Sequence, residues 1–161
     1  MARTGGESAA ATPLAPDLAE RLARIAPEVH EVITNMHGEV WAALDPELLE
    51  LCRLRIATLQ SDDEEFARPA PGASVSAEKL VAIGSWPTSP LFSDRECACL
   101  AFTEQFVGDV AGTTQEDVDG LLAHLSSEEV QAFVTALLAL DQHQRLALGL
   151  RTVLASEEET A

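Results

Sequence analysis

The stretch Ser126–Leu148, SSEEVQAFVTALLALDQHQRLAL, carries the clearest structural signal in this chain. Its apolar side chains recur at helical spacing and mark one face for burial, namely Val130, Phe133, Val134, Leu137 and Leu138. Ser126 and Glu129 have the spacing of a capping box, in which each side chain binds the other residue's backbone amide. The stretch therefore predicts a long C-terminal helix that ends near Leu154.

Similar signals upstream predict four further main helices and one short helix. The predicted segments are, in chain order, a helix over 16–44 broken at Pro27, helices over 46–59, 77–83, 93–110 and 114–124, and the C-terminal helix. Residues 61–77 are rich in Asp, Glu, Pro, Gly and Ser and predict a long loop, and the prolines of Gly84–Pro90 exclude a helix there. No stretch alternates as a strand does, so the predicted fold class is all-α.

The size and composition of the chain predict one globular domain with a short tail at each end. Its 161 residues are 47% hydrophobic, and we place the domain over residues 16–155. Residues 1–15 predict a disordered tail, and residues 156–161 predict an acidic one. The three cysteines give no disulfide framework. The sequence has neither a signal peptide nor an apolar run of membrane-spanning length, so we expect a cytoplasmic protein.

The charge of the chain excludes some classes of partner. Asp and Glu number 27 against 10 Lys and Arg, which gives a formal net charge of −17. Such a surface repels phosphate backbones and anionic membranes, so we expect neither nucleic acid nor a membrane as a partner. The sequence contains no P-loop, no GxGxxG and no GxSxG motif. We therefore predict no nucleotide and no other cofactor.

Two charged residues continue the apolar face of the C-terminal helix. Asp141 and Arg145 are four residues apart, so they lie one turn apart and can form an ion pair. A charged pair on a buried face must be paired to offset its desolvation. Two interpretations follow: a structural pair that is buried or bridges two subunits, which we favour, and a polar wall of a substrate pocket.

Other polar residues lie where apolar side chains are expected. Arg55 interrupts the apolar face of the 46–59 helix, and Glu104 interrupts that of the 93–110 helix, so the two could meet across helices. His143, beside the Asp141 and Arg145 pair, is the best candidate for a general base. No histidines or carboxylates have the spacing of a metal site, so we predict no metal.

Three segments resemble a known superfamily in order and spacing. They are ELCRLRIATL at 50–59, LFSDRE with LAFTEQF at 91–96 and 100–106, and DQHQRL at 141–146. Over about residues 29–150 the chain resembles the carboxymuconolactone decarboxylase and alkylhydroperoxidase D-like superfamily. The resemblance implies an alkylhydroperoxidase D-like bundle of about five to seven helices. It also implies a homo-oligomer, as a dimer, trimer or hexamer.

The resemblance places the redox motif of that superfamily on residues that cannot perform thiol chemistry. In its redox members a Glu stands twelve residues before a Cys-x-x-Cys motif, and a His follows the second Cys by four residues. The Glu falls on Glu50, the two cysteines on Asp62 and Glu65, and the His on Pro69. Dithiol peroxidase chemistry needs both thiols, so we predict that it is absent.

The leading functional prediction is a decarboxylase-like enzyme that acts on a small organic acid or carbonyl compound by proton transfer or decarboxylation. Glu50 and His143 are the predicted proton carriers, and the predicted substrate-binding residues are Arg55, Arg145 and Asp141. One alternative is an oxidoreductase that uses a single thiol, most plausibly Cys52. The other is a non-catalytic, oligomeric relative.

Overall fold

The computed structural model describes residues 14–68, 70 and 72–158. This part of the chain contains eight α-helices, two short 3₁₀ helices and no β-strand. The elements are α1 Pro16–Ile25, α2 Pro27–Ala43, α3 Pro46–Gln60, α4 Asp63–Ala67, α5 Ala77–Ala82, η1 Ile83–Thr88, α6 Asp94–Asp109, η2 Val110–Gly112, α7 Gln115–Leu122 and α8 Ser127–Glu158. The predicted all-α class is confirmed.

The helix boundaries follow the local signals of the sequence. Pro27 occupies the first position of α2, and the preceding residue separates this helix from α1. Asp45 caps α3 by accepting a hydrogen bond from the Glu47 amide at 3.0 Å. Ser93 and Glu96 form the predicted capping box of α6, with the Ser93 amide donating to Glu96 Oε2 at 2.8 Å. These predicted boundaries are confirmed.

Two predicted segments differ from the observed ones. The predicted loop 61–77 contains the short helix α4, because Asp62 accepts a hydrogen bond from the Glu65 amide at 3.0 Å and caps its first turn. Residues 83–88 form the 3₁₀ helix η1, where no helix was predicted. Pro87 is tolerated inside η1 because Ser85, with φ −125°, breaks the helix before it.

The two predicted tails lie mostly outside the described residues. Of the N-terminal tail only Leu14 and Ala15 are described, and the Leu14 side chain is buried beside α1 and Ala147 of α8. At the other end α8 continues to Glu158, past its predicted end near Leu154. Residues 1–13 and 159–161 are outside the described part of the chain.

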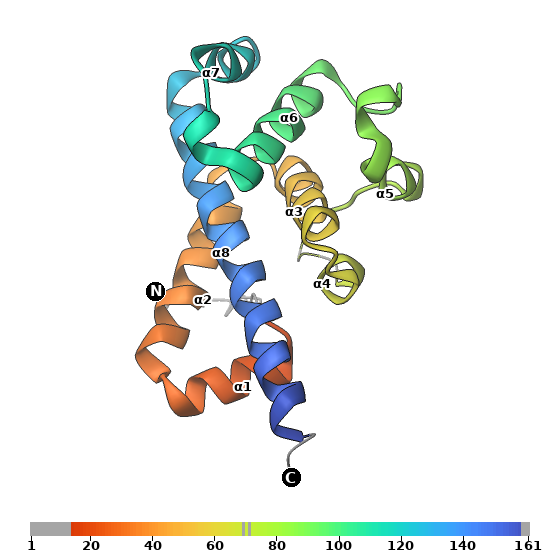
Figure 1. Cartoon of the computed structure of the whole chain (residues 1–161). Helices are drawn as coiled ribbons and strands as arrows, with labels where there is room; N and C mark the ends of the chain where they lie inside the picture. The colour runs from red at the N-terminus through yellow and green to blue at the C-terminus, as the bar shows by residue number, and fades with distance from the viewer. Residues whose placement is uncertain (1–13, 69, 71, 159–161) are drawn as a thin grey trace, which may run out of the picture.

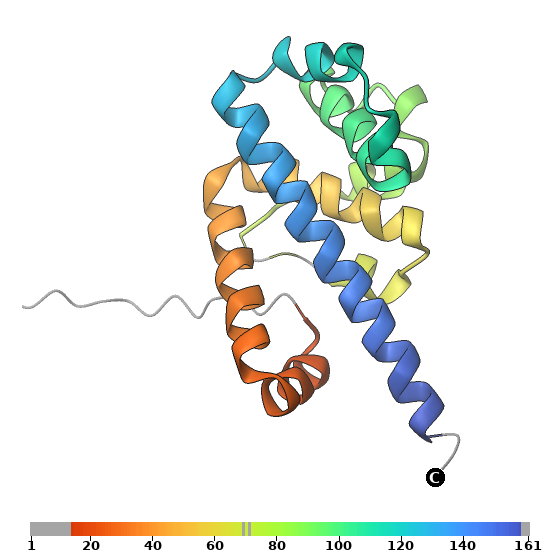
Figure 2. The ribbon, with the colours of Figure 1, turned by 60° about the vertical axis from the view of Figure 1, so that its left-hand side comes forward.

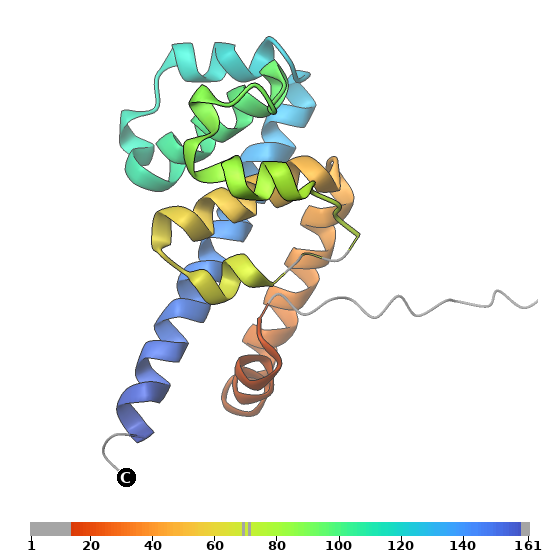
Figure 3. The same cartoon turned by 90° about the vertical axis from the view of Figure 1, so that its right-hand side faces the viewer.

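Helix α8 runs the length of the molecule, and α1, α2, α3, α6 and α7 pack along it (Figure 1). Helix α3 lies at the centre and packs against both α6 and α8. The largest core cluster joins these three helices and α7, through Cys52, Ile56, Cys99, Phe102, Leu121, Phe133 and Leu137. The α1–α2 hairpin packs on α8 from about Ala136 to Ala147 and lies away from α5, α6 and α7 (Figures 2 and 3). None of the described helices, α8 included, is apolar enough over a sufficient length to cross a membrane.

Candidate functional site

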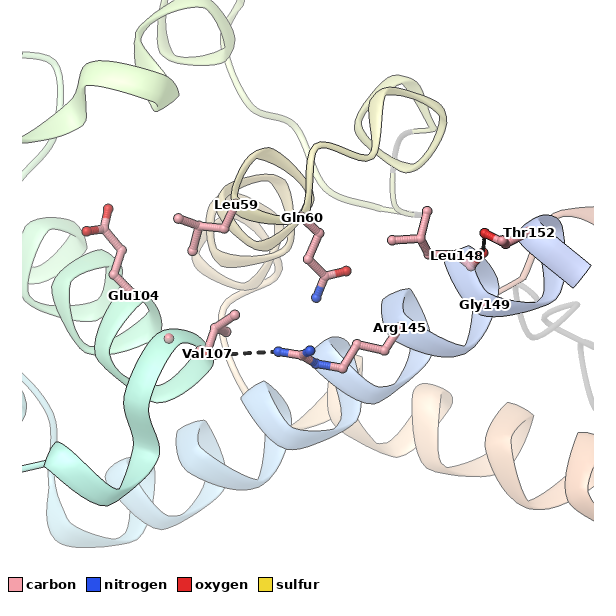
Figure 4. Close-up of a pocket in the computed structure, with 9 residues that line it drawn as sticks. Leu59, Gln60, Glu104, Val107, Arg145, Leu148, Gly149 and Thr152 are labelled. Atoms are coloured by element: carbon pink, nitrogen blue, oxygen red, sulfur yellow. Dashed lines mark hydrogen bonds between the residues drawn. The ribbon is translucent and has the colours of Figure 1, made fainter.

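A groove with a volume of about 770 Å³ opens where α3, α6 and α8 meet (Figure 4). Its walls are mostly apolar or small, and its polar groups are few. The lining residues are Leu59, Gln60, Glu104, Val107, Gly108, Arg145, Leu148, Gly149 and Thr152. A groove of this size, with apolar walls and a few polar groups, has the character of a small-molecule site.

Arg145 is the cationic side chain of this groove. Its Nε lies 2.8 Å from both carboxylate oxygens of Asp141. The carboxylate is held in turn from α3, because Gln60 Nε2 donates to Asp141 Oδ1 at 2.9 Å. The Arg145 side chain is 52% exposed, whereas that of Asp141 is 8% exposed. A buried carboxylate therefore fixes the guanidinium through Nε and leaves its outer nitrogens toward the groove.

The observed Asp141–Arg145 pair combines features of both predicted interpretations, the structural pair and the pocket wall. Asp141 and Arg145 do form the expected ion pair, but only the carboxylate is buried. Arg145 Nη2 makes one long contact, 3.4 Å from the Val107 carbonyl oxygen, and Nη1 has no partner among the described residues. The pair can therefore stabilise the helix packing through Asp141 while Arg145 stays accessible to a ligand.

A second ordered charge borders the groove on α6. Glu104 Oε1 accepts hydrogen bonds from Arg55 Nε at 2.7 Å and from Trp86 Nε1 at 2.6 Å. Its side chain is 34% exposed, and within the described chain its Oε2 accepts no hydrogen bond. Figure 4 shows Glu104 at one end of the groove and Arg145 near its middle, with Leu59 and Val107 between them and Thr152 at the other end. The predicted meeting of Arg55 and Glu104 across helices is confirmed, and Arg55 does not line the groove.

Glu50 belongs to a buried ion cluster behind the groove. Arg53 binds its carboxylate with two hydrogen bonds, from Nε to Oε2 at 2.6 Å and from Nη2 to Oε1 at 2.8 Å. Arg53 Nη1 also donates to Glu65, to Oε1 at 3.0 Å and to the carbonyl oxygen at 2.7 Å. Burial alone would lower the pKa of Arg53, but Glu50 and Glu65 outweigh it and raise that pKa. Both carboxylates are thus tied to one arginine.

His143 faces another histidine. Its Nδ1 lies 3.4 Å from His37 Nδ1, and both rings are buried between α2 and α8. Burial is the main cause that lowers the pKa of each imidazole to about 4, so both are neutral at neutral pH. No third histidine, cysteine or carboxylate joins them as a possible metal ligand in the described residues. Neither His143 nor Glu50 lines the groove.

The comparisons with known proteins concern the fold. No family model and no curated protein matches the sequence. The structure is similar to the crystal structure of a protein of unknown function from Agrobacterium tumefaciens, for which a role in antioxidant defence as an AhpD protein has been suggested. The TM-score is 0.66 at 21% sequence identity, over 80% of this chain and 92% of that chain. The chain has an AhpD-like fold. The AhpD-like bundle predicted from the sequence is thereby confirmed.

In this AhpD-like fold, the residues predicted to replace the redox motif are held by arginines. Asp62 caps α4 and accepts a hydrogen bond from Arg151 Nη2 of α8. Glu65 is bound by Arg53 and by Arg68. Pro69 lies outside the described residues. The two carboxylates therefore serve as anchors for ion pairs between α3, α4 and α8.

The cysteines of the AhpD-like bundle are poor nucleophiles. Cys52 and Cys99 are fully buried, and burial is the main cause that raises both pKa values, that of Cys99 to about 12. Burial and the nearby acidic residues also raise the pKa of the half-buried Cys97. Since the thiolate is the reactive form, the raised pKa values favour the protonated, less reactive form of all three thiols at neutral pH.

Sequence reasoning missed several groups that organise the groove and the histidine pair. Trp86 and Gln60 orient Glu104 and Asp141 from other helices, which no local spacing could indicate. The contact between His37 and His143 spans 106 residues. The ion pair of Arg53 with Glu50 could have been predicted, because Arg53 lies three residues after Glu50 on the same helix face.

Proposed function

We propose that this protein is an enzyme that binds a small, largely apolar organic acid in the groove between α3, α6 and α8 and acts on it by proton transfer. One observation carries the proposal, namely the half-exposed guanidinium of Arg145 in a mostly apolar groove. Because its Nε is fixed by a buried carboxylate, the guanidinium is oriented before a ligand arrives. An oriented arginine suits hydrogen bonding to a carboxylate, and the apolar walls suit the body of the acid.

We assign the proton acceptor to Glu104. Arg55 and Trp86 hold one oxygen of this carboxylate, which leaves Oε2 to take a proton from a carbon next to a substrate carbonyl group. Arg55 then positions the base. Anchoring a carboxylate on Arg145 stabilises the ground state, which opposes the loss of that same group as CO₂. This reasoning favours proton transfer over decarboxylation of the anchored group.

The earlier prediction that Glu50 and His143 carry the proton remains a prediction with less support. Arg53 occupies both oxygens of Glu50, and the Ala70 amide also approaches Oε1 at 3.3 Å. Neither oxygen of this carboxylate is therefore left free to bind a substrate.

A homo-oligomer also remains a proposal. It is supported by the exposed apolar side chains on the α1–α2 hairpin, Ile25, Val29 and Val32.

Replacing Arg145 with glutamine is expected to weaken carboxylate binding by about 10- to 100-fold, the range for a lost hydrogen bond to a charged group. The ligands are matched pairs of a small acid and its carboxamide, for example benzoate and benzamide, titrated by NMR. The wild-type protein should prefer the acid, and Arg145→Gln should bind both alike. The charge-matched control is Arg95→Gln, which removes a half-exposed arginine from the far end of α6. Equal affinity of the wild-type protein for acid and amide would contradict the proposal.

A thiol-dependent oxidoreductase is the rival enzyme, and we expect it to fail a direct test. The wild-type protein should not reduce hydroperoxides in the presence of a dithiol, because its three thiols are protonated and partly or fully buried. The measurement is peroxide consumption before and after alkylation with iodoacetamide. Rapid consumption that alkylation abolishes would show that a single cysteine is active after all.

A further inference from the structure

Two buried histidines hold the α1–α2 hairpin against α8. His37 of α2 is 8% exposed and His143 of α8 is 5% exposed. Their rings lie 5.2 Å apart between centroids, tilted by 50°, with the Nδ1 atoms at 3.4 Å. A hydrogen bond between two Nδ1 atoms requires that one of them carry a proton and the other none. Protonation of both Nδ1 atoms therefore replaces this bond with repulsion between two cations.

The surroundings of the pair oppose a positive charge. Arg53 of α3 and Arg68, which follows α4, both act on His37 and lower its pKa, after burial and His143 itself. The carboxylates near these arginines, Glu50 and Glu65, are already bound to them. On the α8 side, burial dominates for His143, and a backbone hydrogen bond to residue 33 of α2 only partly opposes it.

The hairpin packs mainly on α8, and the end of α2 also contacts α3. Helix α1 contacts α8 through a cluster of its own that contains Leu18, Leu22 and Ala147. Helix α2 contacts α8 through a second cluster, which includes Val40 and Ala136. Figures 2 and 3 show the hairpin beside α8, with α5, α6 and α7 at the other end of the molecule. The histidine pair is the polar contact between these apolar clusters.

We propose that the His37–His143 pair is an acid-sensitive latch, which holds the α1–α2 hairpin on α8 and releases it when both imidazoles are protonated. In the docked state both pKa values are about 4, against 6.5 for a free histidine. The docked state is therefore fully stabilised above about pH 6.5, and its stability falls as the pH drops toward 4. Linkage gives about a tenfold change in the opening equilibrium per pH unit for each proton taken up on release.

Hydrogen exchange of the full chain tests the latch. Between pH 6.5 and 4.5, after correction for intrinsic exchange rates, opening of residues 16–43 should increase about 1,000-fold relative to α6, because both histidines take up a proton on release. His37→Gln and His143→Gln each remove one of the two titrating groups and should each reduce this pH dependence to about 40-fold, the value for one proton. The control His124→Gln removes an exposed histidine after α7 and should leave the dependence unchanged. Unchanged pH dependence in both latch variants, or a parallel rise in α6, would overturn the proposal.

A second measurement needs no variant. Imidazole NMR signals of the wild-type protein should include two, those of His37 and His143, that titrate below pH 5 in the folded state. Protonation of these two histidines at low pH should accompany the loss of contacts between α2 and α8. Titration of all four histidines near pH 6.5 in the folded protein would refute the latch even if a variant failed to fold.

Discussion

Replacing Arg53 with methionine is expected to destabilise the fold by about 3–5 kcal/mol, the cost of leaving buried charges without their partner. Arg53 is 3% exposed, and it binds the carboxylates of both Glu50 and Glu65. Without it, two buried carboxylates would face each other across an apolar side chain. This loss is a large share of the stability of a typical domain.

Urea denaturation of the wild-type protein and three variants measures this effect. Arg95→Met removes a half-exposed arginine whose ion pairs are 3.8 and 3.9 Å long, and it should cost only about 0–1 kcal/mol. The triple variant Glu50→Gln, Arg53→Met, Glu65→Gln removes the charges together and should be more stable than Arg53→Met alone. An Arg53→Met protein as stable as Arg95→Met would mean that water reaches the cluster.

Ion pairs also hold the two carboxylates that lie where the resemblance places the redox cysteines. By the resemblance, Asp62 and Glu65 occupy the positions of the two reactive cysteines. Their charges are matched by Arg151 of α8 and by Arg53 and Arg68. Paired carboxylates stabilise the folded chain but exchange no electrons.

Much of the fold could be predicted because its signals are local. Pro27, Asp45 and the capping boxes determine where helices begin through contacts within four residues. Helix α4 escaped prediction because five mostly acidic residues have no periodic apolar face. It forms where Asp62 caps it and where Arg53 and Arg151 bind it from other helices, and such contacts are invisible in the local sequence.

The candidate site was predictable only in part, for the same reason. The pairing of Asp141 with Arg145 follows from a spacing of four residues. The exposure of the Arg145 side chain does not follow from this spacing, because it depends on where α3 and α6 end beside α8. Glu104 was recognised as unusual from its place on an apolar face, but Trp86, the second donor to its carboxylate, comes from η1.

The second large expected effect is a loss of turnover when the carboxylate of Glu104 is removed. Glu104→Gln is expected to lower turnover by about 10²–10⁴-fold, the usual range for loss of a general base. Glutamine keeps the shape of the side chain and can still accept hydrogen bonds from Arg55 and Trp86, so the fold and the groove should persist. Binding of the acid should stay within about threefold, because Arg145 still holds its carboxylate. Arg145→Gln should show the opposite pattern, weak binding with turnover retained at saturation.

Deuterium exchange tests the proposed proton transfer most directly. Small apolar oxo acids, with the acidic C–H at increasing distance from the carboxylate, are incubated with the protein in D₂O and followed by NMR. We predict that the wild-type protein exchanges the C–H next to the carbonyl group of at least one acid that it binds, and that Glu104→Gln binds this acid without exchanging it. Exchange at the same rate in Glu104→Gln, or binding of the acids without any exchange in the wild-type protein, would contradict the account.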